Sequence, residues 1–275
     1  MNQAAAIQMT SGPEVAGNLE QARPLLEEAA ARGAQLAVLP ENFAFLGLRD
    51  ADKRGIAEPD GDGPIQDFLA ATAQRLKMWL VGGTVPIRGG VDGRVAAASV
   101  VYDADGRRVA RYDKIHLFDV DIPDRAESYR ESAHVAPGSR VVVLDTPVGR
   151  VGLSVCYDVR FPELFRRLSA AGAQILTVPS AFTSPTGRAH WETLLCARAI
   201  ENLCYVIAPA QSGFHPNGRE TYGDSMIVDF WGRVLQRLPR GRGCVVAEVD
   251  AARQVEVRRN FPALMHRVLK EEAEL

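Results

Sequence analysis

The chain has 275 residues, of which 47% are hydrophobic and 24% charged, and its formal net charge is −2. This composition is typical of a globular protein with a large core, and a charge so close to zero gives no electrostatic reason to expect nucleic acid or an anionic membrane as partner. With four cysteines in no CxxC spacing, no membrane-length apolar stretch and no targeting features in residues 1–7, we expect a cytoplasmic protein without structural disulfides or zinc.

The first half of the chain is predicted to alternate strands with helices. Asn18 is placed to cap a helix that runs to Arg32 and ends at Gly33, a residue that readily adopts the left-handed conformation found after helices. Pro24 removes one backbone hydrogen bond of that helix and is expected to bend its first turns. The other elements predicted here are strands at 4–9, 36–39 and 79–83, a helix at 64–76, and a hairpin that joins 97–102 to 107–112.

The second half begins with a long polar loop after Lys114, and a structureless loop of that length in a compact domain is usually functional. No linker or repeat interrupts the chain, so we expect one α/β domain over 1–275 with mixed sheets. The elements predicted after the loop are a hairpin of 141–144 with 151–155, helices at 162–171, 189–201 and 251–259, strands at 174–178, 203–208, 225–228, 233–236 and 244–249, and a charged tail at 263–275.

Residues 151–164 contain the most informative junction of the chain. Val151, Leu153 and Val155 alternate with small residues as in a strand, which runs into Cys156, and Pro162 suits the first turn of a following helix. Open α/β sheets hold their active sites at such carboxyl ends of strands. A thiol at this place is a candidate nucleophile, although an isolated free cysteine is more often a small buried hydrophobic residue.

Glu41 and Lys114 favour the catalytic interpretation of Cys156. Each of the three residues follows an apolar strand, so all of them can meet at one rim of a sheet. The carboxylate can accept the thiol proton and return it to a departing amine, the thiolate can attack a carbonyl carbon, and the ammonium can stabilise the oxyanion. These groups suffice for amide hydrolysis, and we expect neither a metal nor a cofactor.

Three motifs in this order resemble the nitrilase superfamily of carbon–nitrogen hydrolases. They are LPEN at 39–42, YDKIHLF at 112–118 and VCYDVRFPEL at 155–164, and the similarity continues through 179–183, 187–192 and 197–202. The resemblance covers nearly the whole chain. Within the superfamily it is strongest to the Nit branch of amidases, and in that branch to the deaminated glutathione amidases.

The resemblance implies a four-layer αββα sandwich and a Glu–Lys–Cys catalytic triad formed by Glu41, Lys114 and Cys156, which acts through a thioester intermediate. It also implies a second glutamate that orients the lysine, and Glu131 is the candidate for that position.

The resemblance further implies a homodimer or a larger homo-oligomer, with the helices at 162–171 and 189–201 packed across a two-fold axis. The side chains expected at that interface are Leu164, Phe165, Trp191 and Leu195.

Residues expected to contact the substrate are Tyr157, Arg160, Phe182, Thr183 and Arg219. Tyr157 favours an amidase, because true nitrilases of this superfamily typically carry tryptophan after the nucleophile. Arg160 has two interpretations, an ion pair with Asp158 that holds the nucleophile turn or a position facing the substrate. The segment 211–219 also has two interpretations. It can border the part of the substrate pocket that holds the leaving group, with His215 or Arg219 available to a carboxylate of the substrate. Alternatively, it is a surface hairpin without substrate contacts.

Hydrolysis of a small carboxylated 2-oxo amide is therefore the predicted reaction, with deaminated glutathione as first substrate. The alternative within the family is an ω-amidase acting on α-ketoglutaramate or α-ketosuccinamate. Two alternatives are not amidases. One is a catalytically silent scaffold protein of the same fold, but such a protein would not need all three triad residues. The other is a redox sensor built on Cys156, which would need a second thiol nearby to form a disulfide with it. Packing roles are expected for His116, His190, Cys196, Cys204 and Cys244.

Overall fold

The computed structural model describes residues 2–122 and 127–269. Its α-helices are α1 (Val15–Ala31), α2 (Pro64–Leu76), α3 (Pro162–Ala170), α4 (Ser184–Asn202) and α5 (Ala251–Asn260), with short 3₁₀ helices η1 (Asp50–Arg54), η2 (Val91–Gly93), η3 (Glu131–Ala133) and η4 (Cys156–Arg160). Its strands are β1 (Gln3–Gln8), β2 (Leu36–Val38), β3 (Trp79–Val81), β4 (Val85–Ile87), β5 (Val95–Tyr102), β6 (Arg108–Asp113), β7 (Asp119–Asp121), β8 (Ser128–Arg130), β9 (Val135–Ala136), β10 (Val143–Thr146), β11 (Gly149–Leu153), β12 (Ile175–Thr177), β13 (Tyr205–Ala208), β14 (Ser212–Phe214), β15 (Glu220–Tyr222), β16 (Ser225–Val228), β17 (Val234–Leu238) and β18 (Gly243–Glu248).

Two mixed sheets form the centre of the molecule. Over the described residues, the eight-stranded sheet has the order β18-β1-β2-β3-β5-β4, with β6 and β9 also paired to β5, and the six-stranded sheet has the order β10-β11-β12-β13-β16-β17. Two further pairs, β7 with β8 and β14 with β15, form separate hairpins. Strands β1, β2 and β3 are mutually parallel, as are β11, β12 and β13.

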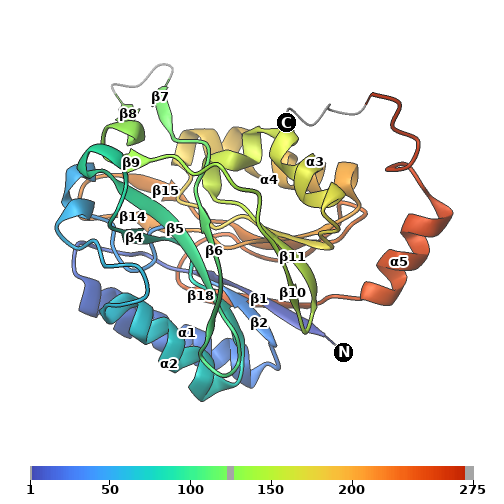
Figure 1. Cartoon of the computed structure of the whole chain (residues 1–275), viewed down its shortest axis with the longest axis horizontal. Coiled ribbons are helices and arrows are strands. Elements are labelled where there is room, and N and C mark those ends of the chain that lie inside the picture. The colour runs from blue at the N-terminus through green and yellow to red at the C-terminus, as the bar shows by residue number, and fades with distance from the viewer. Residues whose placement is uncertain (1, 123–126, 270–275) are drawn as a thin grey trace.

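The sheets lie face to face between two layers of helices (Figure 1). Helices α1 and α2 pack on the eight-stranded sheet, and α3 and α4 pack on the six-stranded sheet, whereas α5 extends to one side. The predicted four-layer αββα sandwich is confirmed. Among residues 2–122 and 127–269, no helix is long and apolar enough to cross a membrane.

Strand β1 explains why the central strands are apolar on both faces. Ala4 and Ala6 belong to the core between the two sheets, whereas Ala5 and Ile7 belong to the core beneath α1 and α2. A strand covered on both sides reads as a continuous apolar run rather than an alternating one, which is the pattern that revealed β1 and β2 in the sequence.

The structure corrects several predicted boundaries. Helix α1 begins at Val15, and Asn18 lies inside it, where its side-chain amide bonds the backbone of Gly12 and the carbonyl oxygen of Ala44 instead of capping the helix. Helix α4 begins at Ser184, five residues before the prediction. The long loop after Lys114 holds β7, β8, η3 and β9, and β4 was not predicted. Helix α2 has the bounds that the sequence predicted.

The side chains expected at an oligomer interface lie inside the chain itself. Leu164 is 4% exposed, and the other three predicted interface side chains, those of Phe165, Trp191 and Leu195, are fully buried in the core under the six-stranded sheet. They are therefore not available to a second subunit, and that part of the prediction is wrong. The oligomeric state and the single domain stay predictions, and residues 270–275 of the predicted tail lie outside the described part of the chain.

Candidate active site

Glu41, Lys114 and Cys156 meet at one end of the two sheets, each shortly after a strand. Glu41 follows β2, Lys114 follows β6 and Cys156 follows β11. Strand β5 is antiparallel to both β3 and β6, so β6 runs in the same direction as β2 and its carboxyl end reaches the same edge. The sheet topology thus brings distant side chains together: Glu41 and Lys114, for example, are 73 residues apart in the sequence.

Cys156 lies at a sharp turn between β11 and η4. It is 7% exposed and has a φ of 49°, a left-handed conformation that costs a non-glycine residue about 1–3 kcal/mol. Its backbone N–H donates to the carbonyl oxygen of Pro179 over 2.9 Å. This bond to the segment after β12 stabilises the strained turn and sets the direction of the thiol.

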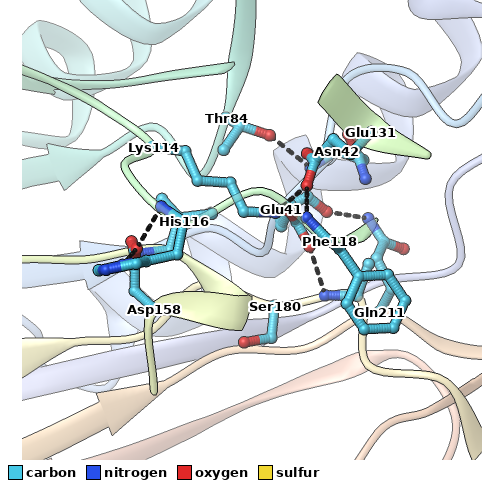
Figure 2. A network of polar contacts seen from close by, with 12 residues as sticks. Glu41, Asn42, Thr84, Lys114, His116, Phe118, Glu131, Asp158, Ser180 and Gln211 are labelled. Carbon is cyan, nitrogen blue, oxygen red and sulfur yellow. Dashed lines mark hydrogen bonds and ion pairs between the residues drawn. The ribbon is translucent and has the colours of Figure 1, made fainter. Parts of the chain in front are cut away.

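Lys114 lies between two carboxylates (Figure 2). Its Nζ donates to Glu41 Oε1 over 2.8 Å and to Glu131 Oε2 over 2.7 Å, and the lysine is 1% exposed. Glu131 also accepts the backbone N–H of Phe118, and the other oxygen of Glu41 accepts the N–H of Ala181 over 2.9 Å. Both carboxylates are therefore held from a second side, and the position of the ammonium is determined by theirs.

The buried charges set the protonation states of the site. Burial alone would raise the pKa of Glu41, but the charge and hydrogen bond of Lys114 outweigh it and hold that pKa below the ordinary 4.5. Burial alone would likewise lower the pKa of Lys114, yet the charges of Glu131 and Glu41 raise it well above 10.5. At neutral pH the site therefore contains an ionised glutamate and a charged lysine.

The thiol of Cys156, in contrast to Glu41 and Lys114, is held in its neutral form. Burial first, and the nearby negative charge of Glu41 second, raise its pKa, and the charge of Lys114 offsets this only partly. The thiol and the Glu41 carboxylate line the same cavity, and the charge of that carboxylate acts on the pKa of the thiol. The resting site thus contains a protonated thiol and an ionised carboxylate, so a thiolate at Cys156 can form by proton transfer within the site.

A narrow cavity of about 40 Å³ opens onto these groups. All nine site residues predicted from the sequence line it, the four catalytic candidates Glu41, Lys114, Glu131 and Cys156 and the five contact candidates Tyr157, Arg160, Phe182, Thr183 and Arg219. The residues that sequence reasoning missed are Asn42, Asp50, Lys53, Phe118, Tyr129, His134, Val135, Ala181 and Thr186. Asn42, Phe118 and Ala181 belong to the three motifs or the segments that extend them, but no sequence pattern marks Lys53, which lies on the short helix η1.

Arg160 does not pair with Asp158, so the ion-pair interpretation is wrong. Its guanidinium carbon lies 5.3 Å from the ring centre of Phe182 and 5.8 Å from that of Tyr157, and one nitrogen contacts His190 over 3.3 Å. The guanidinium lines the cavity, which agrees with the second interpretation. His190 itself is exposed on α4.

Asp158 instead connects the lysine segment to the nucleophile turn. The carboxylate is fully buried and accepts the Tyr112 hydroxyl at 2.7 Å, the N–H and the Nδ1 of His116 at 3.0 and 2.7 Å, and the N–H of Val155 at 2.8 Å. Tyr112 and His116 flank Lys114, and Val155 precedes Cys156. Figure 2 shows His116 and Asp158 beside the Lys114 chain. One side chain therefore holds two segments of the site in register.

Asp158→Ala is expected to destabilise the fold by about 3 kcal/mol, because buried donors lose their acceptor. Chemical denaturation measures the loss. Asp145→Ala is the control, since the Asp145 side chain is 87% exposed and its removal should change the free energy of unfolding by less than about 0.5 kcal/mol. Equal unfolding midpoints for the two variants would contradict the assigned role.

The predicted segment 211–219 contributes one of its two candidate residues to the cavity. Its hairpin of β14 and β15 carries Arg219 into the lining, but His215 is 4% exposed and bonds the Ser11 carbonyl oxygen at 2.8 Å and the Thr221 hydroxyl at 2.7 Å. Burial lowers the pKa of His215 below 6.5. His215 is not available to a substrate carboxylate.

Neither cavity at this end of the sheets offers Cys156 a second thiol from the described residues. All four cysteines are free; Cys204 and Cys244 are buried, and Cys196 is half-buried on α4. The resolving thiol that a redox sensor needs is therefore missing from the lining.

Comparisons with known proteins identify the family. The model of the carbon–nitrogen hydrolase family matches residues 3–259. A protein of Synechocystis sp. (strain PCC 6803 / GT-S), called deaminated glutathione amidase, is 45% identical over 268 residues, which are 96% of this chain and 97% of that protein.

Solved structures agree with this result. The C. elegans NitFhit protein has a TM-score of 0.90 and 39% identity over 97% of this chain, which spans only 65% of that longer protein. Saccharomyces cerevisiae Nit3, a member of branch 10 of the nitrilase superfamily, has a TM-score of 0.85 and 29% identity, covering 98% of this chain and 96% of Nit3. The resemblance seen in the three motifs is thereby confirmed, and the chain belongs to the carbon–nitrogen hydrolase family.

Proposed function

We propose that this protein is a thiol-dependent amidase in which Cys156 is the nucleophile, Glu41 the general base and acid, and Lys114 the electrophilic group. The observation that carries the proposal is that a buried thiol, a buried carboxylate and a buried ammonium line one cavity, with the ammonium donating to the carboxylate over 2.8 Å. In such a site the thiolate forms by transfer of one proton from the thiol to the carboxylate.

In the acylation step, the Cys156 thiol gives its proton to Glu41 while the sulfur attacks the amide carbon. The tetrahedral intermediate then collapses, the C–N bond breaks, and Glu41 returns the proton to the leaving nitrogen. The product of this step is a thioester on Cys156. Glu41, again ionised, takes a proton from water, and the resulting attack on the thioester releases the acid and restores the thiol.

Lys114 is suited to stabilise the oxyanion in both steps. An ammonium group has three N–H donors, and Glu41 and Glu131 accept two of them. No described residue accepts the third, which remains for the substrate oxygen. Because two carboxylates hold the ammonium in place, its contribution requires no rearrangement when charge develops on that oxygen.

The substrate that best suits this cavity is a carboxylated 2-oxo amide, and we propose deaminated glutathione. The relative from Synechocystis, which is 45% identical to this chain, is called deaminated glutathione amidase. Arg160 lines the cavity without a carboxylate partner among the described residues, and a guanidinium binds a carboxylate through two parallel hydrogen bonds. It can therefore hold the acid end of the 2-oxo acyl group.

A steady-state comparison of three amides tests this proposal. Amine or ammonia release is measured with deaminated glutathione, α-ketoglutaramate and α-ketosuccinamate under identical conditions. The highest kcat/KM is expected for deaminated glutathione. Preference for α-ketoglutaramate would make the protein an ω-amidase and leave the triad unaffected, whereas no turnover of any 2-oxo amide would refute the substrate class.

Glu131→Gln is expected to lower kcat by roughly tenfold with little change in KM, since glutamine keeps the shape but loses the charge that orients Lys114. The effect should be milder than removal of Lys114 itself. Glu163→Gln, a change at an exposed glutamate of α3 that lines neither cavity, is the matched control. Full activity of Glu131→Gln would show that Glu41 alone suffices to place the lysine.

For its setting in the cell, we propose the cytoplasm and a homo-oligomeric state. Four free cysteines are compatible with a reducing compartment. Cell fractionation tests the first statement. A stable, fully active monomer in sedimentation at micromolar concentration would contradict the second.

A further inference from the structure

A second, larger cavity adjoins the catalytic one. It has a volume of about 410 Å³, roughly ten times that of the inner cavity, and five residues line both, namely Asn42, Asp50, Lys53, Tyr129 and Arg219. The rest of its wall comes from the loop before η1, from β8 and from the hairpin turn at 217–218. We refer to it as the outer chamber.

The volumes of the two cavities suit different parts of a substrate, the acyl group and the leaving group. The inner cavity contains Cys156 and has space for little more than the acyl group that reacts there. A leaving group larger than ammonia has to extend beyond it. The outer chamber adjoins the inner cavity along the five shared residues, and its volume of about 410 Å³ suits a dipeptide.

Two cations stand at the junction of the cavities. Lys53 is half-buried on η1 and forms no ion pair with any residue in the part of the chain that the structure describes. Arg219 donates one Nη to the carbonyl oxygen of Ala181 and lies 5.1 Å above the ring of Tyr129, while its Nε is buried and finds no hydrogen-bond acceptor among the described residues. A buried donor without an acceptor is costly, and a ligand oxygen would relieve that cost.

The other charged groups of the outer chamber leave this pair of cations uncompensated. Arg49 already pairs with Asp52 over 3.2 Å. Glu127 accepts the Tyr129 hydroxyl over 3.1 Å. Asp50 lines both cavities but forms no ion pair with Lys53 or Arg219. An anion at the junction would therefore face two cations that have no carboxylate partner of their own.

We propose that the outer chamber binds the leaving group of the substrate, and that Lys53 and Arg219 together bind its terminal carboxylate. This rests on the proposed amidase function and adds the leaving-group specificity to it. The chemical class selected is an amide whose amine portion is a short peptide with a free carboxyl end. An amide that releases ammonia leaves the outer chamber empty and gains nothing from either cation.

A matched pair of substrates isolates this interaction. One is deaminated glutathione, and the other is the same molecule with its glycine carboxylate converted to a neutral carboxamide. Both share the acyl group and the scissile bond, so the ratio of their kcat/KM values reports only on the carboxylate. We expect the wild-type protein to prefer the carboxylate by about fivefold, as for a partly exposed charge contact.

Lys53→Met and Arg219→Met should each reduce this ratio, and the double variant should bring it to about one. Because Lys53 also lowers the pKa of Glu41, and Arg219 touches the backbone of Ala181, either change can alter the rates with both substrates, but the ratio cancels such effects. Lys77→Met is the matched control, since Lys77 is 69% exposed at the end of α2 and lines neither cavity. It should retain the wild-type ratio.

Calorimetric binding of both compounds to Cys156→Ala separates this proposal from the function on which it rests. Tighter binding of the carboxylate that requires Lys53 and Arg219, without turnover by the wild-type protein, would refute the amidase proposal and support the outer chamber. Two outcomes would overturn the outer-chamber proposal and leave the amidase proposal intact. In the first, the wild-type protein hydrolyses both compounds with equal kcat/KM. In the second, both single variants and the double variant keep the wild-type ratio of the two kcat/KM values.

Discussion

Cys156→Ala is expected to lower amide hydrolysis by about 10⁶-fold, to the background of the assay, because the removal of a nucleophile from a catalytic triad costs about that much. Cys156→Ser should be nearly as inactive, since the serine hydroxyl is a far weaker acid than the thiol and Glu41 is a weak base. Both variants should keep the wild-type fold, because alanine and serine are no larger than cysteine.

The measurement is steady-state turnover combined with mass spectrometry of protein quenched at low pH during turnover. Wild-type protein should accumulate one acyl group on Cys156, and the variants should accumulate none. Cys196→Ser is the control, because that half-buried thiol on α4 lines neither cavity, and it should retain full activity. Substantial hydrolysis by Cys156→Ala would refute the nucleophile assignment.

Lys114→Ala has the second largest expected effect, a loss of about 10²–10³-fold in kcat, as for other oxyanion donors. The variant also leaves the buried Glu41 and the half-buried Glu131 without their shared cation, so it should lose about 3–5 kcal/mol of stability. Lys114→Arg should not restore activity, because a planar guanidinium cannot occupy the place of a compact ammonium between the two carboxylates.

The pH profile separates the catalytic effect of Lys114 from its effect on folding. Glu41 must be ionised to accept the thiol proton, and its pKa lies below 4.5 in the wild type because Lys114 outweighs burial. Without Lys114, burial dominates and that pKa should rise above 4.5. The acid limb of kcat/KM should therefore move to higher pH in Lys114→Ala. Wild-type activity of Lys114→Arg, or an acid limb that does not move, would contradict this assignment.

The catalytic candidates could be predicted because each of them stands next to a signal that depends on local sequence. Glu41 and Cys156 closely follow apolar runs, which are buried strands whichever sheet they join, and Lys114 follows the second strand of a hairpin with a clear turn sequence. The motifs around them then pointed to the carbon–nitrogen hydrolase family. The same local signals located the helix at 64–76 and most of the strands.

Other positions could not be predicted because their partners lie far away in the sequence. One of the two interpretations of Arg160 pairs it with Asp158, two residues away, whereas Asp158 bonds Tyr112 and His116, more than 40 residues before it. The sequence likewise makes His215 a candidate to bind a substrate carboxylate, whereas its ring is hydrogen-bonded to Ser11 and Thr221. An isolated polar residue gives no indication of which distant segment will supply its hydrogen-bond partner.

By itself, the sequence determined the α-helices and most of the strands, the apolar character of both strand faces and the family, since these depend on residue type and spacing. Only the tertiary structure decided what covers each apolar face and which polar groups meet. Phe165 and Trp191 read as surplus apolar surface but are fully buried beneath the six-stranded sheet. No sequence pattern marks Lys53, yet packing brings it to the mouth of the catalytic cavity. Periodicity shows that a side chain is buried, but the partner it is buried against depends on long-range contacts that no local pattern contains.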